Sequence, residues 1–188
     1  MNNIIEVSTF YYLLHPYRTF LLTCCNAEGK ANIITVAWLM PVSAEPPLLA
    51  VSIRPNRHSY GYIKSTGEFV VNVAQYEIAA QALYCGRRSG RDVDKFAATK
   101  LTPSPARYVT PPIIEECISH LECRVVQEVE AGDHQLFIGE VLAAYTKEEF
   151  VDKDGLYNLS RVHPLLHIGR DRFTSTRAEF IEPSLAEK

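Results

Sequence analysis

The chain has 188 residues, of which 47% are hydrophobic and 22% charged, and its formal net charge at pH 7 is −3. A chain of this length buries roughly 70% of its unfolded surface, so we expect one domain over residues 1–188 with a peripheral tail at 176–188. The weak negative charge excludes the broad positive field by which proteins bind nucleic acids and anionic membranes. We expect neither as a partner.

Localisation is inferred from the N-terminus and the cysteines. The N-terminal residues show no basic region followed by a long apolar stretch, and the apolar run at 33–42 is too short to span a bilayer. We therefore expect a cytoplasmic protein. The cysteines are odd in number and form no Cys-x-x-Cys motif, which favours buried, reduced thiols. They are Cys24, Cys25, Cys85, Cys117 and Cys123.

Short β-rich segments fill the first quarter of the chain. Residues 17–26 and 31–40 are rich in β-branched and aromatic residues and flank a turn signal at 27–29, which predicts a hairpin. Two prolines then precede residues 48–53, whose nearly continuous apolar character predicts a strand buried on both faces.

Helical and extended segments follow. A short helix ending at Gly67 is expected before a strand at 68–73. Residues 76–85 carry apolar side chains at helical spacing, and Gly86 is the expected helix stop. From 87 to 112 the chain is polar and contains prolines, which predicts an extended connection rather than a second domain.

The second half begins with an alternating strand. Residues 120–129 alternate apolar with charged side chains, which predicts one face in solvent that carries Glu122. After a turn at 131–133, residues 135–146 are apolar on both faces, and a last strand is expected at 165–169. Many short strands without a long helix predict an all-β barrel with short helical insertions.

A basic segment lies at the junction between a strand and a helix. No acidic residue occurs from 51 to 66, where Arg57, His58 and Ser59 open the helix. First-turn amides and the helix dipole, together with Arg57 and Ser59, suit a phosphate monoester. The alternative is a solvated turn capped by Asn56 or Ser59.

A second basic run spans residues 85–96 and includes Lys95. The alternative to a binding role is a charged, solvated surface loop. Its glycines do not form G-x-G-x-x-G, and no P-loop is present, so a Rossmann or NTPase function has no support.

Phosphate contacts alone would leave a weak site. Charge-assisted hydrogen bonds contribute about 1.5–3 kcal/mol each, whereas micromolar binding needs roughly 8 kcal/mol after association costs. A tight ligand therefore needs a planar apolar part, for which Thr35, Val36, Ala37 and Trp38 offer a strand end. The alternative places Trp38 in the core.

Histidines give little sign of metal binding. His163 and His167 are four residues apart, but Pro164 lies between them and a strand would separate them by about 13 Å, so no metal site is expected. His134 follows a turn and precedes a buried strand, which places it at a barrel mouth. No Ser/His/Asp or paired-carboxylate pattern indicates a hydrolase.

Seven phrases in order resemble the FMN-binding split barrel of the flavin reductase-like family over most of residues 10–175. They are GKANIITVAWLMPVSAEPPLLAVSI, the RHS turn at 57–59, STGEFVVNV, CGRRSGRDVDKF, LEC at 121–123, GDHQLFIGEV and VHPLLHIGRDRF. The resemblance implies an antiparallel barrel of the Greek-key type, a homodimer and FMN near the subunit interface, with FAD as the alternative. The implied cofactor-binding residues are Thr35, Val36, Ala37, Trp38, Ser52, Arg57, His58, Ser59 and Lys95.

The resemblance also implies an activity. NAD(P)H would be a transient co-substrate that reduces the flavin, and His134 would stand near the reacting face of the ring. Similar proteins often end the last strand with two glycines, whereas here Arg170 follows Gly169. We interpret Arg170 as a contact to the phosphate of a pyridine nucleotide.

The sequence does not distinguish free flavin, ferric iron and a partner redox protein as the final electron acceptor. The alternatives to a reductase are an FMN-binding electron carrier that does not oxidise NAD(P)H efficiently and a barrel that binds no flavin.

Overall fold

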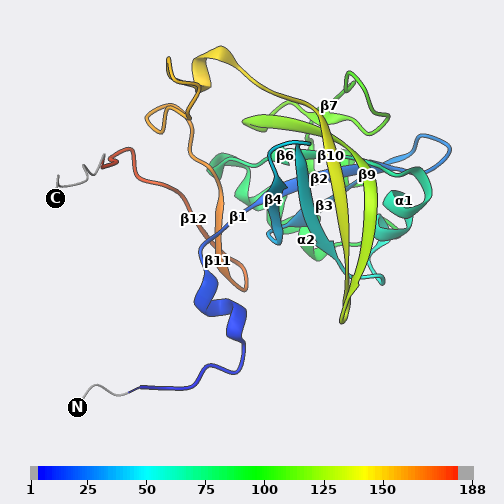
Figure 1. Ribbon diagram of the computed structural model, residues 1–188, viewed down its shortest axis with the longest axis horizontal. Coiled ribbons are helices and arrows are strands. Elements are labelled where there is room, and N and C mark those ends of the chain that lie inside the picture. Colours follow the sequence, from blue (N-terminus) through cyan, green and yellow to red (C-terminus); the bar gives the residue numbers. More distant parts are fainter. Residues whose placement is uncertain (1–3, 182–188) are drawn as a thin grey trace.

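A computed structural model describes residues 4–181. Within them, a seven-stranded antiparallel sheet has the strand order β3-β2-β6-β9-β10-β5-β4 (Figure 1). Its strands are β2 (Phe20–Cys25), β3 (Ala31–Val36), β4 (Leu39–Ser43), β5 (Leu48–Ile53), β6 (Glu68–Val73), β9 (Ser119–Ala131) and β10 (His134–Thr146). The expected all-β barrel with short helical insertions is confirmed.

The first expected hairpin forms, but its second strand is shorter than predicted. Strand β3 pairs with β2 across a turn in which Gly29 has a φ of +80°. The predicted strand 31–40 is wrong beyond Val36, because Leu39 belongs to β4 and faces Val51 of β5. Strands β3 and β4 therefore follow one another in sequence but form opposite edges of the sheet.

Both faces of the central strands are buried, as predicted for residues 48–53. On β2, Phe20, Leu22 and Cys24 point into one apolar cluster, while Leu21 belongs to a second cluster on the other face. The second cluster is completed by helix α2 (Ala79–Arg87) and by residues near the last strand. All five cysteines are buried and form no disulfide, which agrees with the expectation.

The helices refine two sequence expectations. Helix α1 (His58–Thr66) ends at Gly67, whose φ is +69°, as predicted. After η2 (Tyr76–Ile78), α2 continues through Gly86 to Arg87, so Gly86 does not stop the helix. A Cβ there would approach the Cβ of Thr35 to 3.3 Å, which shows that this glycine serves the close packing of α2 on β3.

The connection expected to be extended between residues 87 and 112 contains regular structure. Helix α3 (Lys95–Thr99) is capped by Asp94, whose carboxylate accepts a hydrogen bond from the Ala97 amide. Strand β7 (Pro103–Ser104) pairs with β8 (Ile113–Ile114). The sequence shows this cap as a common acidic residue before a short, weakly apolar run, so the helix has little local signal.

The prediction that Glu122 faces solvent is wrong, because its side chain is fully buried. Its carboxylate accepts hydrogen bonds from the amides of Arg107 (2.8 Å) and Tyr108 (2.6 Å) and from the Tyr145 hydroxyl (2.8 Å). Burial by itself raises the pKa of Glu122, but these donors outweigh it and lower the pKa. The carboxylate thus attaches the loop at 107–108 to the barrel.

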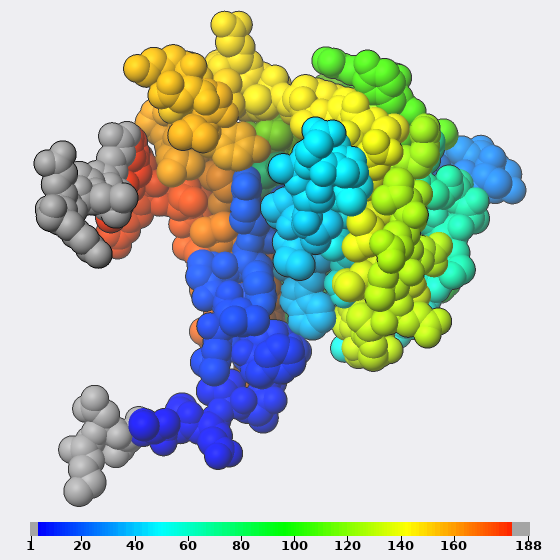
Figure 2. Space-filling model, in the orientation of Figure 1, coloured from blue at the N-terminus to red at the C-terminus, as the bar shows by residue number. Residues whose placement is uncertain are grey.

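A second sheet lies beside the barrel. Within the described residues it contains β1 (Tyr17–Arg18), β11 (Leu166–Gly169) and β12 (Arg172–Thr174), and β11 confirms the expected last strand (Figure 1). In Figure 2 the orange residues near the C-terminal end of the chain lie against the blue N-terminal segment, to one side of the cyan and yellow residues. The N-terminal segment carries η1 (Phe10–Leu14), and η3 (Glu148–Phe150) precedes this sheet. Residues 182–188 of the expected tail lie outside the described residues. Between residues 4 and 181 no helix has the length and apolar character needed to cross a membrane.

We expect Glu122→Gln to lower the free energy of unfolding at pH 7 by about 1–3 kcal/mol, because an amide cannot accept all three hydrogen bonds as a carboxylate does. The folded pKa of Glu122 is below its ordinary value of 4.5, so its contribution is present above that pH and is lost as the pH falls through the folded pKa. Urea unfolding at neutral and acidic pH measures both effects.

The control is Glu130→Gln, an exposed position on the same strand. Equal losses of stability in the two variants would contradict a special role for the buried carboxylate.

Candidate functional site

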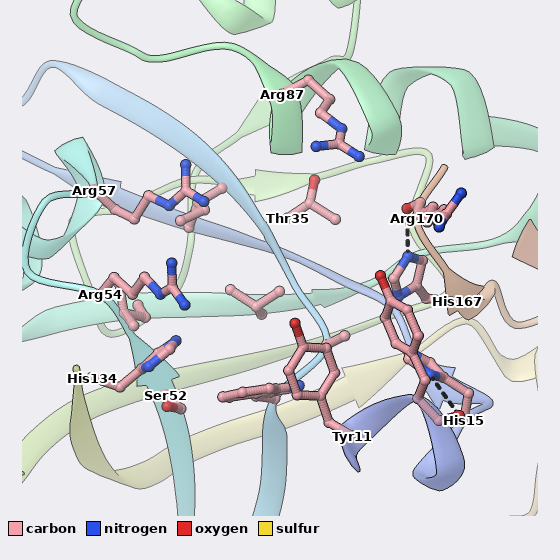
Figure 3. Close-up of a pocket in the computed structure, with 16 residues that line it drawn as sticks. Tyr11, His15, Thr35, Ser52, Arg54, Arg57, Arg87, His134, His167 and Arg170 are labelled. Atoms are coloured by element: carbon pink, nitrogen blue, oxygen red, sulfur yellow. Dashed lines mark hydrogen bonds between the residues drawn. The ribbon is translucent and has the colours of Figure 1, made fainter. Parts of the chain in front are cut away.

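The main cavity opens where the chain passes from β3 to β4. Its volume of about 410 Å³ lies within the usual range for ligand sites. One wall is formed by Thr35–Trp38 and by Ser52 and Ile53 of β5 (Figure 3). The other residues that line it are Tyr11, Tyr12, His15, Ile34, Arg54, Arg57, Arg87, His134, His167 and Arg170.

Trp38 forms a wall of this cavity and is not a core residue, since 36% of it is exposed. Its ring lies against His134, with centroids 4.9 Å apart and an interplanar angle of 31°, and Tyr11 contacts it edge-on at 5.3 Å. The Trp38 carbonyl accepts a hydrogen bond from the Ser52 amide at 2.9 Å. The backbone at the strand break is therefore held in place while the indole faces the cavity.

His134 is oriented by its neighbour in the turn. Its Nδ1 lies 2.6 Å from Oδ1 of Asp133, and Oδ2 of Asp133 lies 2.9 Å from Nη2 of Arg54. The hydrogen bond from His134, together with the nearby Arg54, lowers the pKa of Asp133. The carboxylate is therefore ionised and accepts a hydrogen bond from the N–H group at Nδ1 of His134. The other ring nitrogen of His134, Nε2, is thus the one left for a ligand.

Cations dominate the charge around the cavity. Figure 3 shows Arg54, Arg57 and Arg87 extending toward the space in front of Thr35, with Arg170 at the opposite side from Arg57. Among the described residues, no carboxylate lines this cavity. A chain with a net charge of −3 therefore concentrates positive charge here.

A second cavity of about 310 Å³ adjoins the first at the start of α1. The two share Ile34, Arg57 and Arg87 as lining residues. The second is also lined by His58, Ser59, Lys95, Arg88 and Arg91, and Asp92 is the one acidic residue among its described lining residues. The basic run at 85–96 therefore contributes to a cavity wall, and its Arg87, Arg88 and Arg91 are also exposed to solvent, as the alternative of a charged surface loop predicts.

The first turn of α1 is free of a side-chain cap. Helix α1 follows Arg57, and neither Asn56 nor Ser59 caps it, so the alternative of a capped surface turn is wrong. Ser59 is buried and its hydroxyl accepts a hydrogen bond from Nδ2 of Asn32 at 2.7 Å. The Tyr60 amide donates a hydrogen bond to the Arg57 carbonyl at 3.1 Å, so in the described structure the amides of His58 and Ser59 are the ones left to a ligand or solvent.

Lys95 places a buried cation at the same cavity. Only 5% of the residue is exposed, and its Nζ donates hydrogen bonds to the carbonyls of Ile33 (2.6 Å) and Cys85 (2.7 Å). Burial, with a smaller effect of Arg57, lowers its pKa. No carboxylate pairs with it within residues 4–181. A buried charge without a counter-ion is costly, and an anion bound in this cavity would compensate it.

The structure thus brings the predicted site residues together in two adjoining cavities. The first contains Thr35, Val36, Ala37, Trp38, Ser52, Arg57, His134 and Arg170, and the second contains Arg57, His58, Ser59 and Lys95. Sequence reasoning missed Tyr11, Tyr12 and His15, which reach the site from the N-terminal segment and carry no local signal of it. His163 lies elsewhere and contacts Glu77, with Nδ1 and Oε1 2.9 Å apart.

Comparisons with known proteins address the family. A model of the flavin reductase like domain matches residues 12–175. An uncharacterized protein of Archaeoglobus fulgidus is 36% identical over 178 residues, which cover 95% of this chain and 98% of that protein. Flavoredoxin of Desulfovibrio vulgaris (Miyazaki F) is similar with a TM-score of 0.86 and 28% identity, over 97% of both chains.

An FMN-binding protein of Thermus thermophilus, solved with bound 1-cyclohex-2-enone, is similar with a TM-score of 0.84 and 25% identity, over 97% of this chain and 99% of that one. The matched family region contains nearly all residues that line the two cavities. The expected split-barrel fold is confirmed. The chain belongs to the flavin reductase-like family of flavin-binding split barrels.

Proposed function

We propose that this protein binds FMN and acts as an NAD(P)H-dependent flavin reductase that passes electrons to a further acceptor. The acceptors we consider are free flavin, ferric iron and a partner redox protein. The observation that carries the proposal is the buried Lys95, which has no carboxylate partner among residues 4–181. Its cavity shares Arg57 with the cavity that Trp38 lines. That pair of cavities suits a planar ligand with a phosphate tail.

The hydrogen-bond donors around the second cavity support the binding of the FMN phosphate there. Arg57, Lys95 and the uncapped first turn of α1 all offer hydrogen-bond donors with positive charge or partial charge. Ser59 is held by Asn32, so its hydroxyl proton is free to point toward a ligand. These are the features by which proteins hold a phosphate monoester.

The break between β3 and β4 supports the binding of the flavin ring in the main cavity. Ala37 and Trp38 lie outside the strand ladders, and we assign their amides to the polar edge of the flavin. FMN supplies the hydride and electron transfer chemistry when bound. The chain's own contribution is orientation and hydrogen bonds at the part of the ring where negative charge develops.

His134 is the residue we assign to proton handling. Nδ1 of His134 is engaged in the hydrogen bond to Asp133, so Nε2 is the atom that we assign to donating or accepting a proton. The Trp38 ring lies against the imidazole and limits its movement. Arg54 holds Asp133 from the other side. These contacts favour one orientation of the ring before any substrate arrives.

We also propose that the protein works as a homodimer. Trp38, Met40 and Val42 are partly exposed in or beside β4, and Leu136 and Ile138 of β10 are apolar and half-buried. A groove of about 350 Å³ on this face is lined by Met40, Ala50 and Leu136 together with residues of the N-terminal segment. A large apolar surface of this kind suits a second copy of the chain.

Lys95→Met tests the phosphate end. We expect it to weaken FMN binding by about 10- to 100-fold, because a charge-assisted hydrogen bond contributes about 1.5–3 kcal/mol. Riboflavin, which lacks the phosphate, should bind equally well to wild type and variant in a fluorescence titration. Lys64→Met, an exposed lysine on α1 outside both cavities, is the control. Equal losses for FMN and riboflavin would contradict the assignment.

His134→Ala tests the reductase. We expect the variant to keep FMN, while NAD(P)H bleaches its visible absorbance about 10²-fold more slowly in stopped-flow mixing, the lower range for a general acid or base. Unchanged bleaching would remove His134 from the mechanism. Wild-type protein that stays yellow with NAD(P)H would instead be an electron carrier, and colourless protein that does not bind added FMN would be a barrel without flavin.

Met40→Asp tests the homodimer. Sedimentation of the wild type is expected to give twice the chain mass of 21.2 kDa, and the variant should shift toward one chain because a charge on an apolar interface is costly. A wild-type mass of a single chain at micromolar concentration would overturn the proposal.

A further inference from the structure

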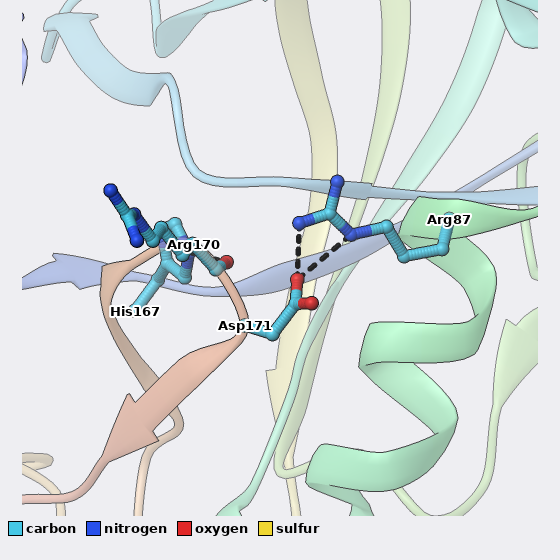
Figure 4. A network of polar contacts seen from close by, with 4 residues as sticks. All are labelled: Arg87, His167, Arg170 and Asp171. Carbon is cyan, nitrogen blue, oxygen red and sulfur yellow. Dashed lines mark hydrogen bonds and ion pairs between the residues drawn. The ribbon is translucent and has the colours of Figure 1, made fainter.

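The turn between β11 and β12 is anchored on both sides. Gly169 and Arg170 both have positive φ, 112° and 53°, and the second value is unfavourable for a residue with a side chain. Nε2 of His167 donates a hydrogen bond to the Arg170 carbonyl at 2.8 Å. Asp171 accepts hydrogen bonds from Nε of Arg87, at 2.8 Å, and from its Nη2 (Figure 4). The turn is thereby tied to the end of α2.

These contacts leave Arg170 as a cation available to a ligand. Asp171 is occupied by Arg87, and in Figure 4 the Arg170 side chain extends away from that ion pair. No ion pair involves Arg170 within the described residues. Arg170 lines the main cavity but not the cavity at the start of α1, so it stands apart from the donors assigned to the FMN phosphate.

A side cavity of about 160 Å³ begins beside Arg170. It is lined by Thr19, Thr35, Arg87 and His167, among other residues, and its volume is below the range of about 300–1,000 Å³ for whole ligands. Thr19 is only 1% exposed, and its hydroxyl has no hydrogen-bond partner in the described structure. A buried hydroxyl left without a partner indicates a polar group that enters this space.

We propose that this side cavity receives the 2′-phosphate of NADPH, held by Arg170 and by the Thr19 hydroxyl. A phosphate offers several strong acceptor oxygens, which match a guanidinium and a hydroxyl at once. The assignment rests on the proposed function, because it makes the electron donor NADPH in preference to NADH. Arg87 and His167 are positioning residues, since they hold the turn that presents Arg170.

The first test measures binding without flavin chemistry. Calorimetric titration with 2′,5′-ADP and with 5′-AMP, which lacks the 2′-phosphate, is carried out on wild type, Arg170→Ala and Thr19→Val. We expect wild type to prefer 2′,5′-ADP about tenfold or more, Arg170→Ala to lose that preference and Thr19→Val to reduce it. Arg172→Ala, an exposed arginine on β12 that lines none of these cavities, should behave as wild type.

The second test compares bleaching of the FMN-loaded proteins by NADPH and NADH. We expect Arg170→Ala to slow the reaction at low NADPH about tenfold and to leave NADH unchanged. A 2′-phosphate preference without bleaching would support the site and refute the reductase. Bleaching at equal rates by NADPH and NADH, with equal binding of the two mononucleotides, would overturn the site and leave the reductase standing.

Discussion

The site depends on a constraint of the sheet, namely that two consecutive strands occupy its opposite edges. Strand β3 pairs with β2, β4 pairs with β5, and the chain between them passes through Ala37 and Trp38. At this point the backbone leaves both ladders, and the side chain of Trp38 turns into a cavity. We therefore place the ring of the proposed ligand at this edge, beside the amides of Ala37 and Trp38.

Two buried charged residues, Glu122 and Lys95, differ in how the chain compensates their charge. Glu122 receives three hydrogen bonds from the chain and lies away from the cavities, so it is satisfied by the protein itself. Lys95 lines a cavity and contacts two carbonyls but, among the described residues, no carboxylate. Because a charge in a protein interior needs compensation, Glu122 serves to hold a loop, and Lys95 is the residue to which we assign an anionic ligand.

A common arrangement orients two of the polar groups at the main cavity. Asp133 pairs with Arg54 and fixes the imidazole of the adjacent His134. Asp171 pairs with Arg87, and the adjacent Arg170 forms no ion pair in the part of the chain that the structure describes. In each case an aspartate in a tight turn is attached to an arginine on another segment, so the neighbouring side chain is placed by a contact that is distant in sequence. Orientation before ligand arrival is what such sites require.

The sequence alone determined most of the long strands, namely β2, β5, β6, β9 and β10, since alternation and β-branched runs reflect local backbone preferences. It also determined α1, where Gly67 supports a left-handed end. It also indicated Arg57, Ser59 and Trp38, because their residue types match a phosphate and a ring. Only the tertiary structure decided that the strand 31–40 breaks at Ala37, that Glu122 is buried, and that Tyr11 reaches the cavity. These features depend on which segments pair across the barrel, and no local pattern records a partner that is distant in the chain.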